Sequence, residues 1–236
     1  MKIKIKGDRL DKIEFKNKFW YYYLELEKEF LEIEKTIPVI DRNSETFSYS
    51  YMKLLRLVCS EIDVLFKKFI ESEEVEIEAK NMGKYEKFIK ENIPEFITQE
   101  NICYNFKSEI LRLKPYEDWN FNKKLIWWEV YTAIKHNRNE KDNAGIEKYK
   151  YANQENTLNA LSALFQLNMF FYKSIIDAEE NEDEIHIPLP QSKIFYLNNW
   201  GNYFENLISE NVYIDHKNGR IRVINGNENY GVDMDE

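Results

Sequence analysis

The stretch NQENTLNALSALFQLNMFFYKSIID, residues 153–177, decides the fold class. Its apolar side chains recur at the three- and four-residue steps of an α-helix, but they occupy most of the helix circumference instead of one stripe. They are Leu158, Ala160, Leu161, Ala163, Leu164, Phe165, Leu167, Met169, Phe170, Phe171, Ile175 and Ile176. A helix that is apolar nearly all round must be covered on every side, so we predict a central helix packed among others.

Three more segments have the periodicity of amphipathic helices, and they span about residues 8–37, 47–72 and 123–138. Alternating charges along the first helix are assigned to its solvated side. These charges are Glu25, Glu27, Lys28, Glu29, Glu32, Glu34 and Lys35. The residues that could cap the start of the second helix are Ser44, Thr46 and Ser48. Together with the central helix, these segments predict four principal helices.

The remaining segments are read as additions to the four helices. Residues 72–120 read as an insertion, acidic at first and then containing a short helix at about 84–92. Near the C-terminus, Val212–Ile214 and Ile221–Ile224 flank an Asn-Gly pair, which is typical of a β-hairpin. Residues 185–188 read as a further strand, and the alternating Lys and Ile residues at positions 2–6 have the right length to pair with the hairpin.

Composition agrees with a mainly α protein. The 236 residues are 43% hydrophobic and 32% charged, and only 7 glycines and 5 prolines leave few turns for an all-β fold. We therefore predict a helical domain over residues 8–178, with the insertion at 72–120, and a small β-containing appendage over 185–225. The apolar runs are shorter than the roughly 20 residues of a membrane span, so we expect no membrane partner.

The cellular setting is also inferred from composition. The N-terminal alternation of Lys and Ile does not resemble a secretory signal, and two cysteines make no disulfide framework, so we expect a reducing cytoplasm. Standard phosphate loops, nucleophile elbows and paired cysteine motifs are absent from the sequence. Its three histidines are His136, His186 and His216, and the last two lie in the appendage. We therefore expect neither a metal nor a cofactor.

One basic segment stands out against the net charge of −9, which itself opposes non-specific attraction to nucleic acid. Residues 121–151 hold seven Lys and Arg against four acids. The candidate nucleic-acid contacts in this segment are Lys123, Lys124, Trp127, Trp128 and Tyr131. Aromatic rings can stack on bases and lysines can meet phosphates, but rings at helical spacing are also typical of a core. Both interpretations stay open.

A second candidate site combines two helices. Glu61 lies at the margin of the apolar stripe of residues 47–72, where a half-buried carboxylate needs a cation or hydrogen-bond donors. Lys135, His136 and Arg138 lie close together near the end of the next principal helix. If the two helices pack antiparallel, Glu61 could pair with Lys135 or Arg138 and leave His136 free to carry a proton. Alternatively, the cations only complement the helix dipole.

Three stretches resemble a known superfamily. They are Cys-Ser-Glu-Ile-Asp-Val at 59–64, Trp-Trp-x-x-Tyr-x-x-Ile-Lys-His-x-Arg at 127–138, and the Asn- and Ala-rich stretch at 152–165. Over about residues 15–200 the chain resembles uncharacterised bacterial proteins of the HEPN superfamily and its abortive-infection relatives. The resemblance implies a four-helix bundle, a homodimer, and RNA binding or cleavage in phage defence, stress or toxin–antitoxin systems.

The resemblance departs from the catalytic pattern at one point. HEPN ribonucleases carry Arg followed four to six residues later by His, whereas here His136 precedes Arg138. One hypothesis is an RNA- or nucleotide-directed defence protein, including a metal-independent ribonuclease that uses His136, Lys135, Arg138 and Glu61. The alternative is a non-catalytic homodimeric or partner-binding module.

Overall fold

The computed structural model describes residues 10–73, 75, 78–104, 106, 110–178, 187–198 and 200, and the backbone of three strands near the C-terminus. The described chain is mainly helical, with two small three-stranded sheets. The helices are α1 (Lys12–Phe15), α2 (Tyr21–Glu34), α3 (Tyr49–Ser72), α4 (Met82–Asn92), α5 (Glu95–Thr98), α6 (Ile126–Asn137) and α7 (Gln154–Ala178). The mainly α class is confirmed.

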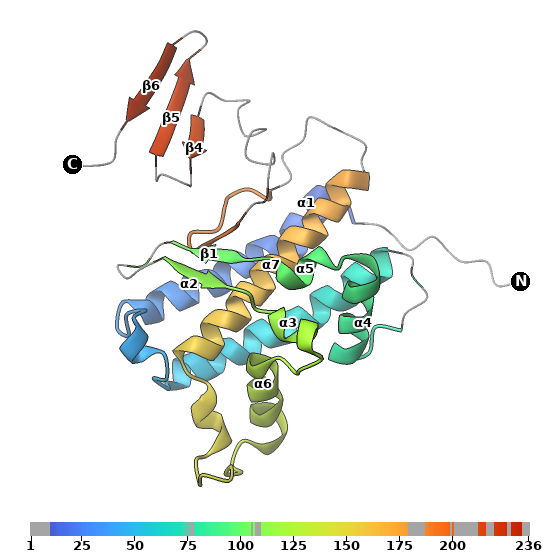
Figure 1. Cartoon of the computed structure of the whole chain (residues 1–236), viewed down its shortest axis with the longest axis vertical. Helices are drawn as coiled ribbons and strands as arrows, with labels where there is room; N and C mark the ends of the chain where they lie inside the picture. The colour runs from blue at the N-terminus through green and yellow to red at the C-terminus, as the bar shows by residue number, and fades with distance from the viewer. Residues whose placement is uncertain are drawn as a thin grey trace, which may run out of the picture.

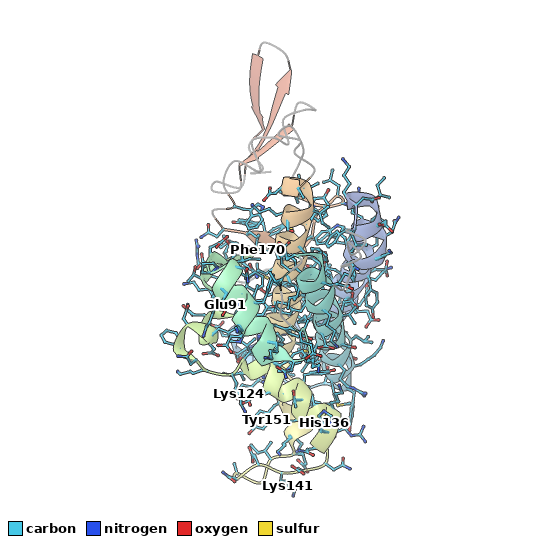
Figure 2. The ribbon with its side chains drawn as sticks, turned by 90° about the vertical axis from the view of Figure 1, so that its right-hand side faces the viewer. Glu91, Lys124, His136, Lys141, Tyr151 and Phe170 are labelled. Carbon is cyan, nitrogen blue, oxygen red and sulfur yellow. The ribbon has the colours of Figure 1, made fainter. Side chains whose placement is uncertain are left out.

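The four predicted principal helices are all present. A π-helical turn, η1 (Lys16–Trp20), joins α1 to α2, so that Lys12 to Glu34 is helical throughout. Short 3-10 segments η2 (Asp41–Asn43), η3 (Glu117–Phe121) and η4 (Lys148–Tyr151) lie in the connections. The helix α6 and the loop after it form one end of the helical layer (Figures 1 and 2).

Side-chain caps fix where the two longest helices begin. Of the three cap candidates for α3, Ser48 is the one used, because its Oγ accepts a hydrogen bond from Tyr51 N at 3.0 Å. The carboxamide of Asn153 accepts from Asn156 N, also at 3.0 Å, at the start of α7. Each cap satisfies an amide that the first helical turn leaves without a partner.

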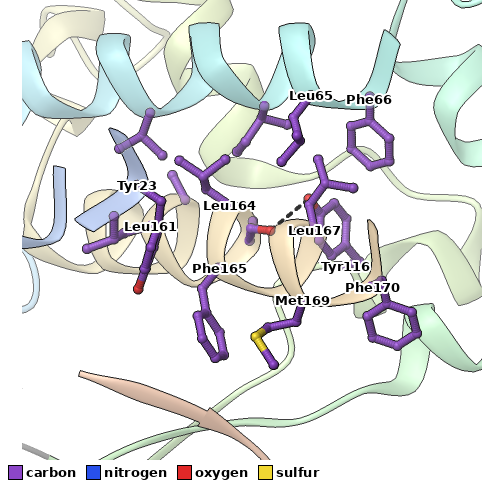
Figure 3. Close-up of a cluster of buried hydrophobic side chains, with 14 of the residues drawn as sticks. Tyr23, Leu65, Phe66, Tyr116, Leu161, Leu164, Phe165, Leu167, Met169 and Phe170 are labelled. Carbon is purple, nitrogen blue, oxygen red and sulfur yellow. Dashed lines mark hydrogen bonds between the residues drawn. The ribbon is translucent and has the colours of Figure 1, made fainter. Parts of the chain in front are cut away.

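The helix α7 lies at the centre of the helical layer, as predicted from its apolar circumference (Figure 1). Leu164 points toward α3, whereas Phe165 and Met169 point to the opposite side of α7 (Figure 3). Phe171 stacks on Phe69 of α3 with ring centroids 4.8 Å apart. Because α7 is buried on nearly all sides, it is the frame against which the other helices are positioned.

The segment read as an insertion takes part in the main core. Tyr85 of α4 stacks on Phe66 of α3 at 4.8 Å, and Phe96 of α5 meets Phe170 of α7 edge-on at the same distance. The segment also supplies β1 (Asn101–Cys103) and β2 (Leu111–Leu113). Rings from this segment therefore complete the covering of α7.

The first sheet contains an edge strand that the sequence did not predict. Its order is β2-β1-β3, all antiparallel, with β3 at Phe195–Leu197. The strand predicted at 185–188 is wrong for Ile187 and Pro188, which lie outside any strand, while 185 and 186 are outside the described residues. Strands of three residues are too short to show an alternating pattern, so their pairing depends on tertiary contacts.

The predicted hairpin is confirmed in the second sheet. Strand β4 (Val212–Asp215) pairs antiparallel with β5 (Arg220–Asn225), with Val212 opposite Val223. A third strand, β6 (Glu228–Val232), pairs with the other edge of β5. The expected strand at 2–6 lies outside the described residues. None of the helices in the described part of the chain has the length and hydrophobicity needed to cross a membrane.

Candidate functional site

The end of α6, the start of the loop after it and the outer face of α3 border two adjoining hollows that are open to solvent, and we call them the basic cleft. One, of about 550 Å³, is lined by Arg56, Ile134, Lys135, His136, Asn137, Arg138, Asn139 and Glu140. The other, of about 530 Å³, is lined by Met52, Lys53, Arg56, Leu57, Ser60, Tyr131 and Lys135. Arg56 and Lys135 line both hollows, so the two form one continuous surface.

Packing of α6 explains why its polar residues face the cleft. Tyr131 and Ile134 are buried in the core, which fixes the rotation of α6 about its axis. With that face buried, Lys135, His136 and Arg138 are left exposed at the end of the helix. The three residues that the sequence grouped are therefore brought together on one surface, and Figure 2 shows His136 near the end of the molecule formed by α6 and its following loop.

Three of the four lysines and arginines that line the cleft form no ion pair with a described acid, and Lys53 is the exception. On its margin, Lys53 binds Glu29 at 3.2 Å, and Glu140, which lines the cleft, binds Lys148 at 2.7 Å. Within the described part of the chain, the side chains of Arg56, Lys135 and Arg138 form no ion pair. Lys135 does place its Nζ 5.6 Å from the centroid of the Tyr131 ring. The cleft therefore presents unneutralised positive charge to solvent.

The structure does not bring Glu61 into the cleft. Glu61 lines neither hollow, and it has no hydrogen bond or ion pair with any described residue, so the predicted pairing with Lys135 or Arg138 is not found. The physical reason is rotation about α3. Glu61 is five residues beyond Arg56, which turns it by about 140° around the helix.

Glu61 instead faces α2. Burial raises the pKa of its carboxyl to about 7, and its charge contributes to raising the pKa of Tyr22 on α2, after the larger effect of burial. The inference that Glu61 is half-buried is confirmed. Apolar periodicity indicates how deeply a residue lies, but it does not identify the neighbouring helix.

The other predicted contacts divide between core and surface. Trp127 is 3% exposed, donates from Nε1 to Pro115 O at 2.9 Å, and meets Tyr116 edge-on, so it is a core residue that cannot stack on a base. Trp128 is half-buried against Tyr131. For Trp127 the core interpretation of the aromatic ridge is the correct one.

The two lysines that precede α6 lie away from the cleft. Lys124 forms an ion pair with Glu129 at 2.8 Å, and Lys123 lies 5.6 Å from the centroid of the Phe121 ring. Figure 2 shows Lys124 at the opposite end of α6 from His136. The basic segment therefore forms two separate surfaces, and the one at the end of α6 borders a hollow together with Arg56 of α3.

Arg56 is the residue of the cleft that sequence reasoning missed. It is exposed on α3, and in the sequence a single arginine on a solvated helix face does not differ from any other surface charge. The available signal was its helical spacing from Lys53 and Ser60, three and four residues away, which places all three on one face. That spacing becomes informative only once α6 is known to border the same face.

Comparison of the chain with family models, with curated proteins and with solved structures finds no match. The function of the basic cleft is therefore inferred from its own geometry and chemistry.

Proposed function

We propose that the protein is an RNA- or nucleotide-directed, HEPN-like protein of bacterial defence whose basic cleft binds phosphate groups. The convergence of Arg56 from α3 with Lys135 and Arg138 from α6, without an ion pair among the described residues, carries this proposal. Guanidinium groups bind phosphate through paired hydrogen bonds and lysine binds it as a point charge. Such a cluster can hold a phosphodiester although the whole chain is acidic.

The same cleft contains a group suited to proton transfer. His136 borders the hollow together with Arg138 and Glu140, and an imidazole can accept or donate a proton. In a metal-independent cleavage, the 2′-hydroxyl loses its proton and attacks the adjacent phosphorus, while the leaving 5′-oxygen gains a proton. His136 would serve one of these transfers, and Lys135 and Arg138 would stabilise the charge on the phosphate. Glu61 lines neither hollow, and the proposal gives it no part in this step.

Charge reversal at the cleft tests phosphate binding. We expect Lys135→Glu to weaken binding of a fluorescein-labelled single-stranded RNA at least tenfold in fluorescence anisotropy, because an attractive phosphate contact becomes repulsive. Lys84→Glu is the matched control, since Lys84 is exposed on α4, has no ion pair in the described chain and undergoes the same change of charge. Equal affinities of the two variants would contradict the proposal.

Cleavage is tested separately from binding. Wild-type protein should degrade single-stranded RNA in the presence of EDTA, and His136→Ala should abolish the degradation while retaining RNA affinity. Undiminished cleavage by the variant would reject the role of His136. RNA binding without cleavage by the wild type would favour a binding protein.

The alternative function is a non-catalytic homodimeric or partner-binding module. Light scattering coupled to size-exclusion chromatography determines whether the chain is a dimer. A dimer that binds no RNA would favour this alternative over a role in RNA recognition.

A further inference from the structure

An exposed cluster of aromatic rings adjoins the basic cleft. Tyr49, the first residue of α3, is 69% exposed, more than any other large hydrophobic or aromatic side chain in the described residues. Its ring is nearly parallel to that of Tyr149 in η4, with an interplanar angle of 12° and centroids 6.4 Å apart. Phe47 contacts both rings edge-on at 5.3 Å. Tyr49 is thus held in orientation by two neighbours while much of its surface remains open.

Helical geometry places Tyr49 and the cleft on one face of α3. Arg56 is seven residues after Tyr49, nearly two full turns, so their side chains point the same way and lie about 10 Å apart along the axis. Met52 and Lys53, which line the cleft, occupy the intervening turn. The exposed ring therefore continues the line of residues that forms one wall of the cleft.

The loop after α6 connects Tyr149 to the cleft. Lys148 binds Glu140 through its side chain, and its backbone N–H donates to Glu140 O at 2.9 Å. Glu140 lines the cleft, and Tyr149 directly follows Lys148. Tyr49 on α3 and Tyr149 on η4 therefore lie beside the basic cleft.

We propose that Tyr49, supported by Tyr149 and Phe47, is a stacking site for a base of single-stranded RNA whose phosphates occupy the basic cleft. This inference rests on the proposed function. Every base has an aromatic face, so stacking adds affinity without strong sequence preference. A ring already oriented by its neighbours loses little conformational entropy on binding. A duplex keeps its bases stacked on one another, so the site selects unpaired nucleotides.

The test uses two probes of equal length, both labelled with fluorescein. One is an eight-nucleotide oligoadenylate, and the other is the same ribose-phosphate chain without bases. In anisotropy titrations of the full chain, Tyr49→Ala should lower affinity for oligoadenylate about fivefold or more and leave affinity for the abasic chain unchanged. Tyr49→Phe should retain wild-type affinity because phenylalanine keeps the aromatic face.

Tyr21→Ala is the matched control, because Tyr21 is an exposed tyrosine on α2 outside the aromatic cluster, and it should change neither affinity. Thermal unfolding of Tyr49→Ala and Tyr49→Phe identifies any loss of folded protein. If wild type binds oligoadenylate and Tyr49→Ala binds it equally well, or loses affinity for both probes alike, the stacking site is refuted while phosphate binding by the cleft stands. If wild type binds neither probe, the proposed function itself fails.

Discussion

Two polar clusters in this protein differ in how their charges are compensated. Around Glu27 of α2, a carboxylate that is 2% exposed is surrounded by neutral donors. Its oxygens accept hydrogen bonds from Tyr23 Oη at 2.7 Å, from Ser192 Oγ, and from Lys193 N at 2.8 Å. In the basic cleft, Arg56, Lys135 and Arg138 face solvent and form no ion pair with a described acid.

The difference follows from solvation. A buried carboxylate loses its water and must be compensated inside the protein, so the donors around Glu27 are required by the fold. They connect α2 to the segment that leads into β3, because Ser192 Oγ also accepts from Phe195 N at 2.9 Å. An exposed guanidinium keeps its water and needs no partner to remain stable. Charge left unmatched at the surface is therefore available to a ligand, whereas the charge of Glu27 serves the structure.

Removal of the Glu27 carboxylate is expected to have the largest effect on stability. Glu27→Ala should lower the free energy of unfolding by about 3 kcal/mol or more, because Tyr23, Ser192 and the Lys193 amide would lose their buried acceptor. Urea denaturation followed by circular dichroism measures the change. Glu25→Ala on the same helix should stay within about 0.5 kcal/mol of wild type, since Glu25 is exposed. Equal stability of the two variants would show that the cluster does not hold the fold together.

In the cleft, substitutions are expected to change RNA binding and to leave stability almost unchanged. The triple variant Arg56→Ala, Lys135→Ala, Arg138→Ala should remain folded, with each substitution changing stability by about 0.5 kcal/mol or less. The dependence of log K for single-stranded RNA on log salt should become shallower by about 0.7 for each lost phosphate contact, or about 2 for the triple variant. Anisotropy titrations over a series of KCl concentrations measure this slope. An unchanged slope would mean that these side chains do not contact phosphate.

The sequence predicted the fold where apolar periodicity was strong. The apolar circumference of the stretch at 153–177 indicated a buried central helix, and serine at position 48 offered the cap that α3 uses. Glu27 was wrongly assigned to the solvated side of α2, because its alternation with Lys28 and Glu29 resembles a solvated surface. Its donors include Ser192, 165 positions away in the chain, and no local pattern reveals such a contact.

The sequence predicted one part of the candidate site and missed the part that depends on contacts between helices. The exposed group at 135–138 was indicated by its position at the end of an amphipathic helix, but Arg56 joins it only through the packing of α6 on α3. The half-burial of Glu61 was also inferred correctly, whereas its neighbouring helix was not. Helical periodicity thus determines depth, and the partners of a residue depend on which helix covers each face.

The smallest expected effect concerns Glu61, and it tests whether a half-buried acid that has no partner among the described residues behaves differently from Glu27. Burial raises the pKa of Glu61 from its ordinary 4.5 to about 7. Between these two pH values the Glu61 carboxyl keeps its proton in the folded protein and loses it in the unfolded chain. This contribution to stability is complete below about pH 4.5 and is lost as the pH rises through 7. Glutamine cannot ionise, so Glu61→Gln should gain stability relative to wild type between pH 5 and pH 8.

The gain should be less than about 1 kcal/mol, because solvent screens a carboxylate that is only half-buried. Urea unfolding of both proteins at the two pH values measures it, with Glu25→Gln as the exposed control. If Glu61→Gln instead loses stability at pH 8, the carboxylate has a cationic partner, as the pairing with Lys135 or Arg138 required. An identical difference at both pH values would mean that water reaches Glu61 freely and that its position beside α2 does not desolvate it.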